Sequence, residues 1–336
     1  SRPPKRVSSA LVSPGKTSFN RTTGSVERGS PMSLKSMPRP APLESITRKL
    51  VPRDENDRLI QSKKASRTPM EVPELGWREK VLDDPDGGRI VLWPHLPCVR
   101  TPPGLRSRRI WDGVAFLLSH NDISSMKEEE KQDRTSPGVH NEAAMASGTT
   151  LGRLVRELEG LDIEGPKIPD PEQIRLILHA ENSRGGLPVF PIEPDLDDAE
   201  WSDWLERSAE KQVNVVTLLS TLTLGRRWSR NSSSAISKIL PDEEVGVDLG
   251  AAAAACAAWW LEEEGSLGWE LYNERDARFA SRIRGALADL RNSRVDDEKA
   301  QEPTLMVPVH QARLPSIAAA LSAWPVPESI VWGSQK

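Results

Sequence analysis

Two histidines in this sequence follow short apolar runs, and a charged triplet precedes the second of them. His95 ends the run "RIVLWPH", and His310 ends "TLMVPVH". Upstream of His310, Glu274, Arg275 and Asp276 lie together at the start of a helical pattern. Histidine and carboxylate side chains are common in proton transfer and in metal binding. The segment is therefore typical either of the end of a catalytic domain or of an ordinary helix–strand unit.

The helical pattern covers residues 267–290 and needs no catalytic explanation. Its apolar positions recur every four residues, at Phe279, Ile283 and Leu287. This spacing predicts an amphipathic helix. The arginines are expected to point largely away from the apolar face: Arg278, Arg282 and Arg284. Because Glu274 lies one turn before Arg278, we also expect an exposed ion pair worth a few tenths of a kcal/mol.

The order of these elements resembles the C-terminal end of the TraB/Tiki family, which includes pheromone-shutdown proteins and metal-dependent membrane-associated proteases. The family has a Glu-Arg-Asn/Asp motif, a helix, and a strand running into Gly-x-x-His-x-x-Gly. Glu274, Arg275 and Asp276 match the first motif, and His310 matches the final histidine. An earlier Gly-x-x-His follows the first strand of the family, and His95 stands in its place. The resemblance spans about residues 89–321.

The resemblance implies a cleft that both strand-end histidines face. His95, His310 and Glu274 would then hold a divalent metal, or Glu274 would act as a general base. Arg275 would steer a carboxylate or stabilise an oxyanion. Both motif glycines are missing, however, because Leu92 and Val307 occupy their positions and "QAR" separates His310 from "LPSI". A β-carbon obstructs close approach where glycine permits it.

Without that resemblance, each histidine is a polar residue that ends a strand. His95 and His310 are more than two hundred residues apart in the chain. We expect that the two imidazoles do not converge and that His310 ends a structural strand. The common hydrolase and zinc signatures, GxSxG, HExxH and CxxC, are absent from the sequence.

The composition predicts one α/β domain with a mixed sheet and flanking helices, over residues 77–332. At 336 residues and 37% hydrophobic content, the chain can bury a core, and all eleven tryptophans lie from Trp77 onward. We expect strands at 89–93, 187–192 and 304–309, and a polar surface insertion at about 124–150. The run "RIWDGVAFLLSHND" is either a helix or a buried strand.

Several local signals predict the helices and turns. Asp170 is a good N-cap and Pro171 suits the first helical position, while "DPDGG" is a turn sequence. The alanine-rich run before Trp260 predicts a central packed helix. Trp201 and Trp204 share one side of a further helix, capped by Asp197 or Asp198. Tryptophan pairs of this kind are typical of core or interface anchors.

Residues 1–76 are expected to form a disordered basic arm and linker. Residues 1–43 carry eight lysines or arginines against one acid, Glu27. Their low apolar content favours disorder. The arm is a plain solvated tail, an organelle-targeting segment of the mitochondrial kind, or a contact for nuclear import or nucleic acid. Because the sequence has two cysteines without a disulfide pattern and no apolar run of roughly 20 residues, we expect an intracellular protein without a membrane span.

Three functions follow as hypotheses. The first is a non-catalytic scaffold or assembly subunit that binds protein partners, with Trp201 and Trp204 on its contact surface. The second is a TraB/Tiki-like metal-dependent hydrolase or a degenerate relative. The third is nucleic-acid binding through residues 1–43, which would weaken steeply with salt.

Overall fold

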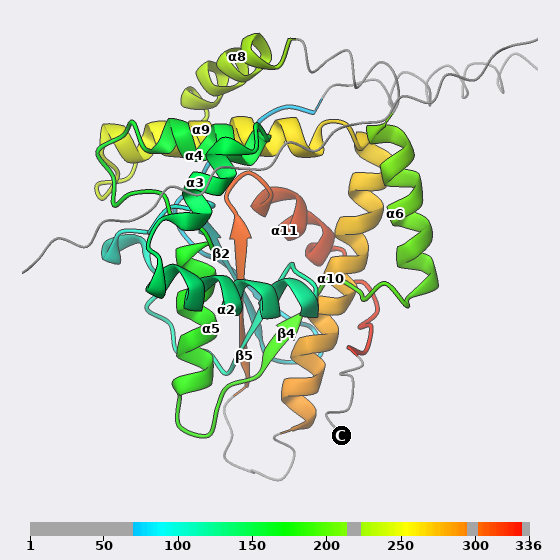
Figure 1. The fold of residues 1–336 in the computed structure, drawn as a ribbon. Helices are drawn as coiled ribbons and strands as arrows, with labels where there is room; N and C mark the ends of the chain where they lie inside the picture. Colours follow the sequence, from blue (N-terminus) through cyan, green and yellow to red (C-terminus); the bar gives the residue numbers. More distant parts are fainter. Residues whose placement is uncertain (1–69, 214–222, 294–301, 331–336) are drawn as a thin grey trace, which may run out of the picture. The chain divides into compact units, whose positions relative to one another are not determined.

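A five-stranded mixed sheet forms the centre of the protein (Figure 1). The computed structural model describes residues 70–213, 223–293 and 302–330. The strands are β1 (Lys80–Asp83), β2 (Arg89–His95), β3 (Gly113–Phe116), β4 (Val189–Pro191) and β5 (Thr304–His310), in the order β1-β2-β5-β3-β4. Only the β1–β2 pair is antiparallel; the other pairs run parallel. This confirms the predicted α/β class.

The three predicted strands correspond to β2, β4 and β5. The ambiguous "RIWDGVAFLLSHND" segment divides between the two alternatives, because its centre forms β3 and its end begins α2 (His120–Thr135). Strand β1 was not predicted. The "DPDGG" turn joins β1 to β2, with positive φ angles at Gly87 and Gly88.

One face of the sheet packs against α10 (Gly268–Asn292) and α11 (Leu314–Ser322). Alternate residues of the central strands point to this side, among them Leu92 and Val307. They meet the predicted apolar face of α10, in which Phe279, Ile283 and Leu287 are all buried. Helix α6 (Ala199–Gln212) extends the same core. The amphipathic helix prediction is thus confirmed.

The opposite face packs against α2 and α5 (Pro171–Asn182). The other set of alternating strand residues points here, including Trp93 of β2 and Met306 of β5. Helix α5 begins as predicted, because the Asp170 side chain accepts hydrogen bonds from the backbone N–H groups of Glu172 and Gln173. The two helix layers place the sheet in the interior, as its near-continuous apolar strands require.

A third group of helices gathers near the carboxyl ends of the strands. It contains α4 (Thr150–Leu158), α8 (Leu224–Ile236) and α9 (Val247–Glu264), which share an apolar cluster. Helix α9 is the predicted alanine-rich helix, and its alanines are buried. In Figure 1 the arrowhead of β5 points toward α9. This arrangement places the end of α9 over the strand ends that carry the histidines.

The predicted polar insertion at 124–150 is helical in the structure. It forms most of α2, all of α3 (Val139–Ala146) and the beginning of α4. Helix α2 starts with a capping box, in which Ser119 and Asp122 each accept a hydrogen bond from the other's backbone N–H. Glutamate and lysine favour helices even where few residues are buried. The low apolar content identified a surface segment but not its conformation.

Packing begins before the predicted boundary at Trp77, since Val72 and Leu75 are both buried. All the described residues belong to one unit, Pro52–Lys336. Residues 1–69, and so the predicted basic arm, lie outside the described residues, as does the 214–222 part of the apolar segment after α6. No helix in the described part of the chain has the length and apolar character needed to cross a membrane.

The arginines of α10 were predicted to point largely away from its apolar face, and they bind distant segments of the chain. Arg282 and Arg284 are buried, and Arg284 pairs with Asp84 beside the β1–β2 turn at 2.7 Å. The predicted ion pair between Glu274 and Arg278 does not form, because Arg278 binds Asp198 instead. The helical pattern in the sequence predicts where these arginines lie along α10. It does not predict their ion-pair partners, which come from distant segments of the chain.

Candidate functional site

His95 and His310 occupy the same register position on the two central parallel strands, β2 and β5. Side chains alternate between the faces of a sheet, so both histidines share the face of Trp93 and Met306. We expected that the two imidazoles do not converge, but the strand register places the two residues side by side and both line one cleft. Neighbouring strands in a sheet lie about 4.8 Å apart, which makes these backbone positions direct neighbours.

Both histidines border a cleft of about 360 Å³ at the carboxyl ends of the strands. The walls come from α2, from the segments after β2 and β3, from the loop before α5, and from the last turns of α9. Apolar wall residues include Leu118, Met126, Ile168, Trp259 and Trp260. Ligands of open α/β sheets bind outside the carboxyl ends of parallel strands. The cleft occupies that location.

Several buried polar atoms at this cleft have no hydrogen-bond partner among the described residues. They are His95 Nδ1, both ring nitrogens of His310, Gln173 Oε1, and the indole nitrogens of Trp259 and Trp260. The nearest carboxylate to His95 Nδ1 is Asp170, with its Oδ2 at 3.6 Å. A buried polar group without a partner costs about 1–3 kcal/mol. Water, an ion or a ligand in the cleft would supply the missing partners of these atoms.

His310 is an uncharged group in this environment. Burial lowers its pKa, and together with the nearby His95 and Arg313 brings it to about 3. Its ring lies between two indoles, edge-on to Trp259 at 6.0 Å and stacked on Trp260 at 6.5 Å between ring centroids. A neutral imidazole offers one N–H donor and one nitrogen acceptor. His310 therefore carries one N–H donor and one nitrogen acceptor, both buried at the wall of the cleft.

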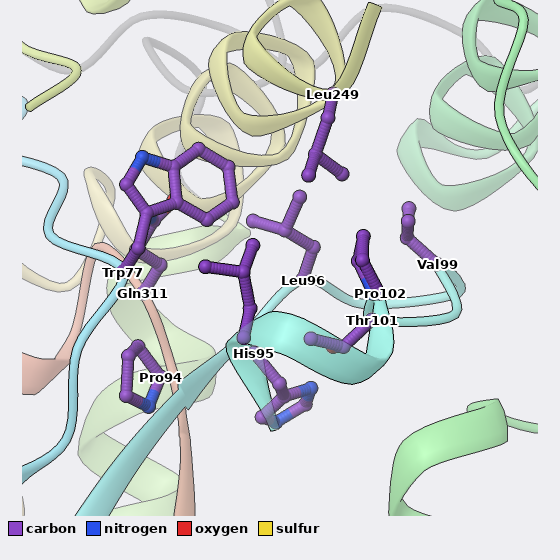
Figure 2. A pocket seen from close by; sticks show the side chains of 10 residues that line it. Trp77, Pro94, His95, Leu96, Val99, Thr101, Pro102, Leu249 and Gln311 are labelled. Atoms are coloured by element: carbon purple, nitrogen blue, oxygen red, sulfur yellow. The ribbon is translucent and has the colours of Figure 1, made fainter. Parts of the chain in front are cut away.

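The second pocket that borders His95 is too small for a ligand (Figure 2). It encloses about 10 Å³, roughly the space of a single water molecule. Trp77, Leu96 and Leu249 form its apolar wall, and the His95 ring points away from Trp77 and Leu249. His95 thus separates this apolar pocket from the larger cleft.

Glu274 is not part of the cleft. It lies on the exposed side of α10, where Arg207 of α6 donates two hydrogen bonds to its carboxylate, at 2.6 and 2.9 Å. These hydrogen bonds lower the pKa of Glu274. The structure therefore brings together His95 and His310 and leaves the predicted third ligand elsewhere. The prediction for Glu274 as metal ligand or general base fails on this geometry.

Arg275 and Asp276 connect α10 to its neighbours. Arg275 pairs with Glu264 at the end of α9, at 2.9 Å, and lies over the rings of Tyr272 and Trp204. Asp276 accepts hydrogen bonds from Arg313, at 2.6 Å, and from the Ser316 hydroxyl. Arg313 and Glu264 both line the cleft, so the predicted catalytic Arg275 holds a wall residue and does not line the cleft itself.

The described residues contain no group of three histidine, cysteine, aspartate or glutamate side chains that could hold a metal ion. Two adjacent imidazoles supply half of a tetrahedral site, and structural or catalytic zinc needs at least three protein ligands. The donor set implied by the resemblance therefore does not fit this cleft.

Cys98 lines the cleft, but it is a poor nucleophile. Burial raises the pKa of its thiol, and the Asp170 carboxylate raises it further. Burial also raises the pKa of Cys256, which lies in the same apolar cluster. The thiolate is the reactive form of cysteine. Both thiols therefore stay protonated and contribute to packing.

Trp201 and Trp204 do not form an exposed contact surface. Both are buried and stack on each other with ring centroids 4.6 Å apart, and Trp204 Nε1 donates to the backbone oxygen of Leu271. Their helix starts at the predicted cap, Asp198. Tryptophan pairs were predicted to be core or interface anchors, and this pair lies in the core.

Glu193 was missed by the sequence analysis. It follows β4, at the same carboxyl edge of the sheet as the cleft. Burial raises its pKa to about 7 and Asp122 adds to this effect, although Arg275 and Arg313 oppose it. A perturbed carboxyl group at a strand end is a common feature of functional sites. Its position after "LPVFPI" was the available signal, because that run was predicted to be a strand.

Comparisons with protein-family models, with curated proteins and with solved structures found no match for this chain.

Proposed function

We propose that the protein is a non-catalytic ligand-binding protein and that a small organic ligand occupies the cleft at the carboxyl ends of β2 and β5. The observation that carries this proposal is the pairing of His95 with His310, since three of their four ring nitrogens are buried without a hydrogen-bond partner among the described residues. Buried polar atoms without a partner in the protein are satisfied by an ordered water, an ion or a ligand.

The size and walls of the cleft support the same proposal. Its volume of about 360 Å³ falls within the roughly 300–1,000 Å³ of small-molecule sites. Such sites combine mostly apolar and aromatic walls with a few convergent polar groups. Here Trp259, Trp260 and Met126 provide apolar surface, while His95, His310 and Gln173 provide polar atoms.

A fragment screen tests the proposal directly. Ligand-observed NMR would compare binding of an aromatic and aliphatic fragment library, of mixed charge, to the wild type and to His310→Phe. Phenylalanine keeps the ring and removes both nitrogens. The matched control is His179→Phe, because His179 is exposed on α5 and its ring contacts Trp111, away from the cleft.

We expect a set of fragments that bind the wild type and the His179→Phe variant but are lost or weakened in His310→Phe. Circular dichroism would establish that each variant keeps its fold. A screen in which no fragment depends on His310 would reject the proposed site.

A degenerate relative of the TraB/Tiki family is the second candidate. The adjacent positions of His95 and His310 favour it, since the resemblance implies one cleft faced by both histidines. Isothermal titration with Zn²⁺ would distinguish it: a metal-binding relative should bind Zn²⁺ in a manner that His95→Ala and His310→Ala each abolish. Because the described residues offer only two adjacent imidazoles and no third ligand, we expect no Zn²⁺ binding that depends on these histidines.

The predicted scaffold role also remains a proposal, without Trp201 and Trp204 as its contacts. Nucleic-acid binding through residues 1–43, and mitochondrial or nuclear targeting by the same arm, remain predictions outside the described residues. Deleting residues 1–43 should remove any salt-sensitive nucleic-acid binding completely. Salt-sensitive binding by the truncated chain would contradict that assignment.

A further inference from the structure

We infer that the ligand of the His95–His310 cleft is an organic cation: an amine or substituted ammonium group carried on an aromatic or apolar body. This inference rests on the proposed ligand-binding function and adds the chemical class of the ligand. Three independent features of the cleft carry it: the charge of the lining, the aromatic residues beside the histidines, and the unpaired acceptor atoms.

The charge of the lining is strongly negative. Four carboxylate residues line the cleft, namely Glu129, Asp170, Glu263 and Glu264, against a single guanidinium, Arg313. Two lining residues form ion pairs with residues outside the lining: Arg313 with Asp276, and Glu264 with Arg275. Counting these two outer residues leaves the excess of negative charge unchanged. With those partners included, five carboxylates stand against two guanidiniums. A concave site lined by one sign of charge attracts a ligand of the opposite sign.

The four carboxylates are not equally available. Asp170 caps α5 and also accepts from the backbone N–H of Cys98, and Glu263 accepts a hydrogen bond from Thr150. Glu129, half-buried on α2, forms no ion pair with any described residue. It is therefore the carboxylate best placed to pair with a ligand cation.

Aromatic surface adjoins this negative lining. Trp259 and Trp260, in the penultimate turn of α9, both line the cleft and flank His310. The face of tryptophan is the strongest side-chain partner for a cation through its ring quadrupole. Aromatic residues beside carboxylates are a common way to bind substituted ammonium groups, because the rings accept the apolar substituents as well. The same surface would repel an anionic ligand.

Unpaired acceptors supply the third feature. Gln173 Oε1 is buried at the cleft without a hydrogen-bond partner among the described residues, and it can only accept. His95 is 4% exposed, and its Nδ1 also has no hydrogen-bond partner there. An ammonium group offers N–H donors and no acceptor, so it matches an oxygen acceptor beside carboxylates. The indole N–H groups of Trp259 and Trp260 are donors at the same cleft that are also unpaired in the described part of the chain, so a ligand that satisfies every buried atom also carries an acceptor on its apolar body.

Three probes of similar shape and different charge test the inference: phenethylamine, phenethyl alcohol and phenylpropionate. Binding to the full chain would be measured by the intrinsic fluorescence of the tryptophans and by ligand-observed NMR. We expect phenethylamine to bind at least about tenfold more tightly than phenethyl alcohol, and phenylpropionate to bind weakest. The preference should decline as salt concentration rises.

Matched variants on α2 locate the effect. Glu129→Gln should weaken phenethylamine binding by about twofold to fivefold, as loss of a partly exposed ion pair predicts, and leave phenethyl alcohol unchanged. Glu128→Gln is the control, because Glu128 is on the same helix, pairs with Lys131 and does not line the cleft.

The outcomes separate this inference from the proposed function. Equal or tighter binding of phenethyl alcohol or phenylpropionate, with His310-dependent fragments still present in the screen, would overturn the cation preference alone. If none of the three probes binds, the test is the charge of the fragments whose binding depends on His310. The inference is rejected if most of those fragments are neutral or anionic. The absence of any His310-dependent fragment rejects the site itself.

Discussion

His95 and His310 are directly opposite each other on adjacent parallel strands, and the backbone N–H of Gln311 donates to the backbone oxygen of His95 at 3.1 Å. This hydrogen bond extends the β2–β5 pairing one residue beyond the strand and fixes the relative height of the two histidines. Because β2 and β5 end together, both imidazoles reach the same cleft.

Replacing His310 by phenylalanine should not destabilise the protein. Both ring nitrogens are buried without hydrogen-bond partners in the described structure, and the ring packs between Trp259 and Trp260. The phenyl ring removes two unsatisfied polar atoms, whose burial costs free energy, and is only slightly larger than the imidazole ring. Urea denaturation should give a free energy of unfolding equal to or above that of the wild type. A loss of more than about 1 kcal/mol would contradict this expectation.

Removing the Arg284 guanidinium should destabilise the protein by about 3–5 kcal/mol, because it leaves a buried carboxylate with one remaining cation. Both side chains of the Arg284–Asp84 pair are almost fully buried, and Arg291 is the other arginine bound to Asp84. Burial raises the pKa of Asp84, but the hydrogen bonds and charge of Arg284, with hydrogen bonds from the Asp86 backbone and Arg291, together hold that pKa below its usual value. Urea denaturation of Arg284→Met measures the effect.

The control for this variant is Arg89→Ala, which removes an exposed pair with Asp83 on the same β1–β2 hairpin. That change should cost no more than about 1 kcal/mol. Similar losses in the two variants would contradict the role of burial.

Two helical glycines should respond in opposite directions to alanine. A β-carbon at Gly285 of α10 would lie 1.8 Å from the backbone oxygen of Glu328, so the C-terminal segment would have to move. We expect Gly285→Ala to lower the midpoint of thermal unfolding, with a cost of about 1–3 kcal/mol or more. Gly250 of α9 has its nearest neighbour, Ile239 Cδ1, at 3.9 Å. Gly250→Ala should therefore raise the midpoint, by up to about 1 kcal/mol of helix propensity. Stabilisation by Gly285→Ala would contradict the close approach.

The stability of the protein should contain a pH-dependent contribution from Glu193. Burial, with a further effect from Asp122, raises its folded-state pKa from 4.5 to about 7, while Arg275 and Arg313 face it with positive charge. Between these two values the folded state keeps a proton that the unfolded state has released. The contribution is therefore fully present below pH 4.5, declines as the pH rises, and is lost above about pH 7.

Glu193→Gln removes this titration and provides the measurement. The free energy of unfolding of the variant minus that of the wild type should increase by up to about 1.4 kcal/mol per pH unit across this interval and then level off. Urea denaturation at a series of pH values gives this difference directly. A difference that does not vary with pH would show that Glu193 ionises alike in both states.

Local sequence was sufficient to predict elements that depend on neighbours in the chain. Asp170 and Pro171 start α5 because capping and a fixed φ act within one turn. The four-residue apolar period predicted α10, and the apolar runs ending at His95 and His310 predicted β2 and β5. The polar segment at 124–150 was predicted as a surface insertion without its helices, because a helix with a capping box needs little apolar surface when most of its residues face solvent.

The tertiary structure alone decided which charged and polar side chains meet. Helical spacing suggested Arg278 as the partner of Glu274, but the packing of α6 against α10 brings Arg207 to it instead. The pairing of His95 with His310 is a property of the β2–β5 register, which forms between segments far apart in the sequence. The apolar periodicity of a strand predicts which of its faces is buried, but it does not predict which strand lies beside it. The sequence by itself therefore determined α5, α9, α10, β2 and β5 and their buried faces, because those signals are local. Strand order and register, which long-range packing sets, assembled the cleft.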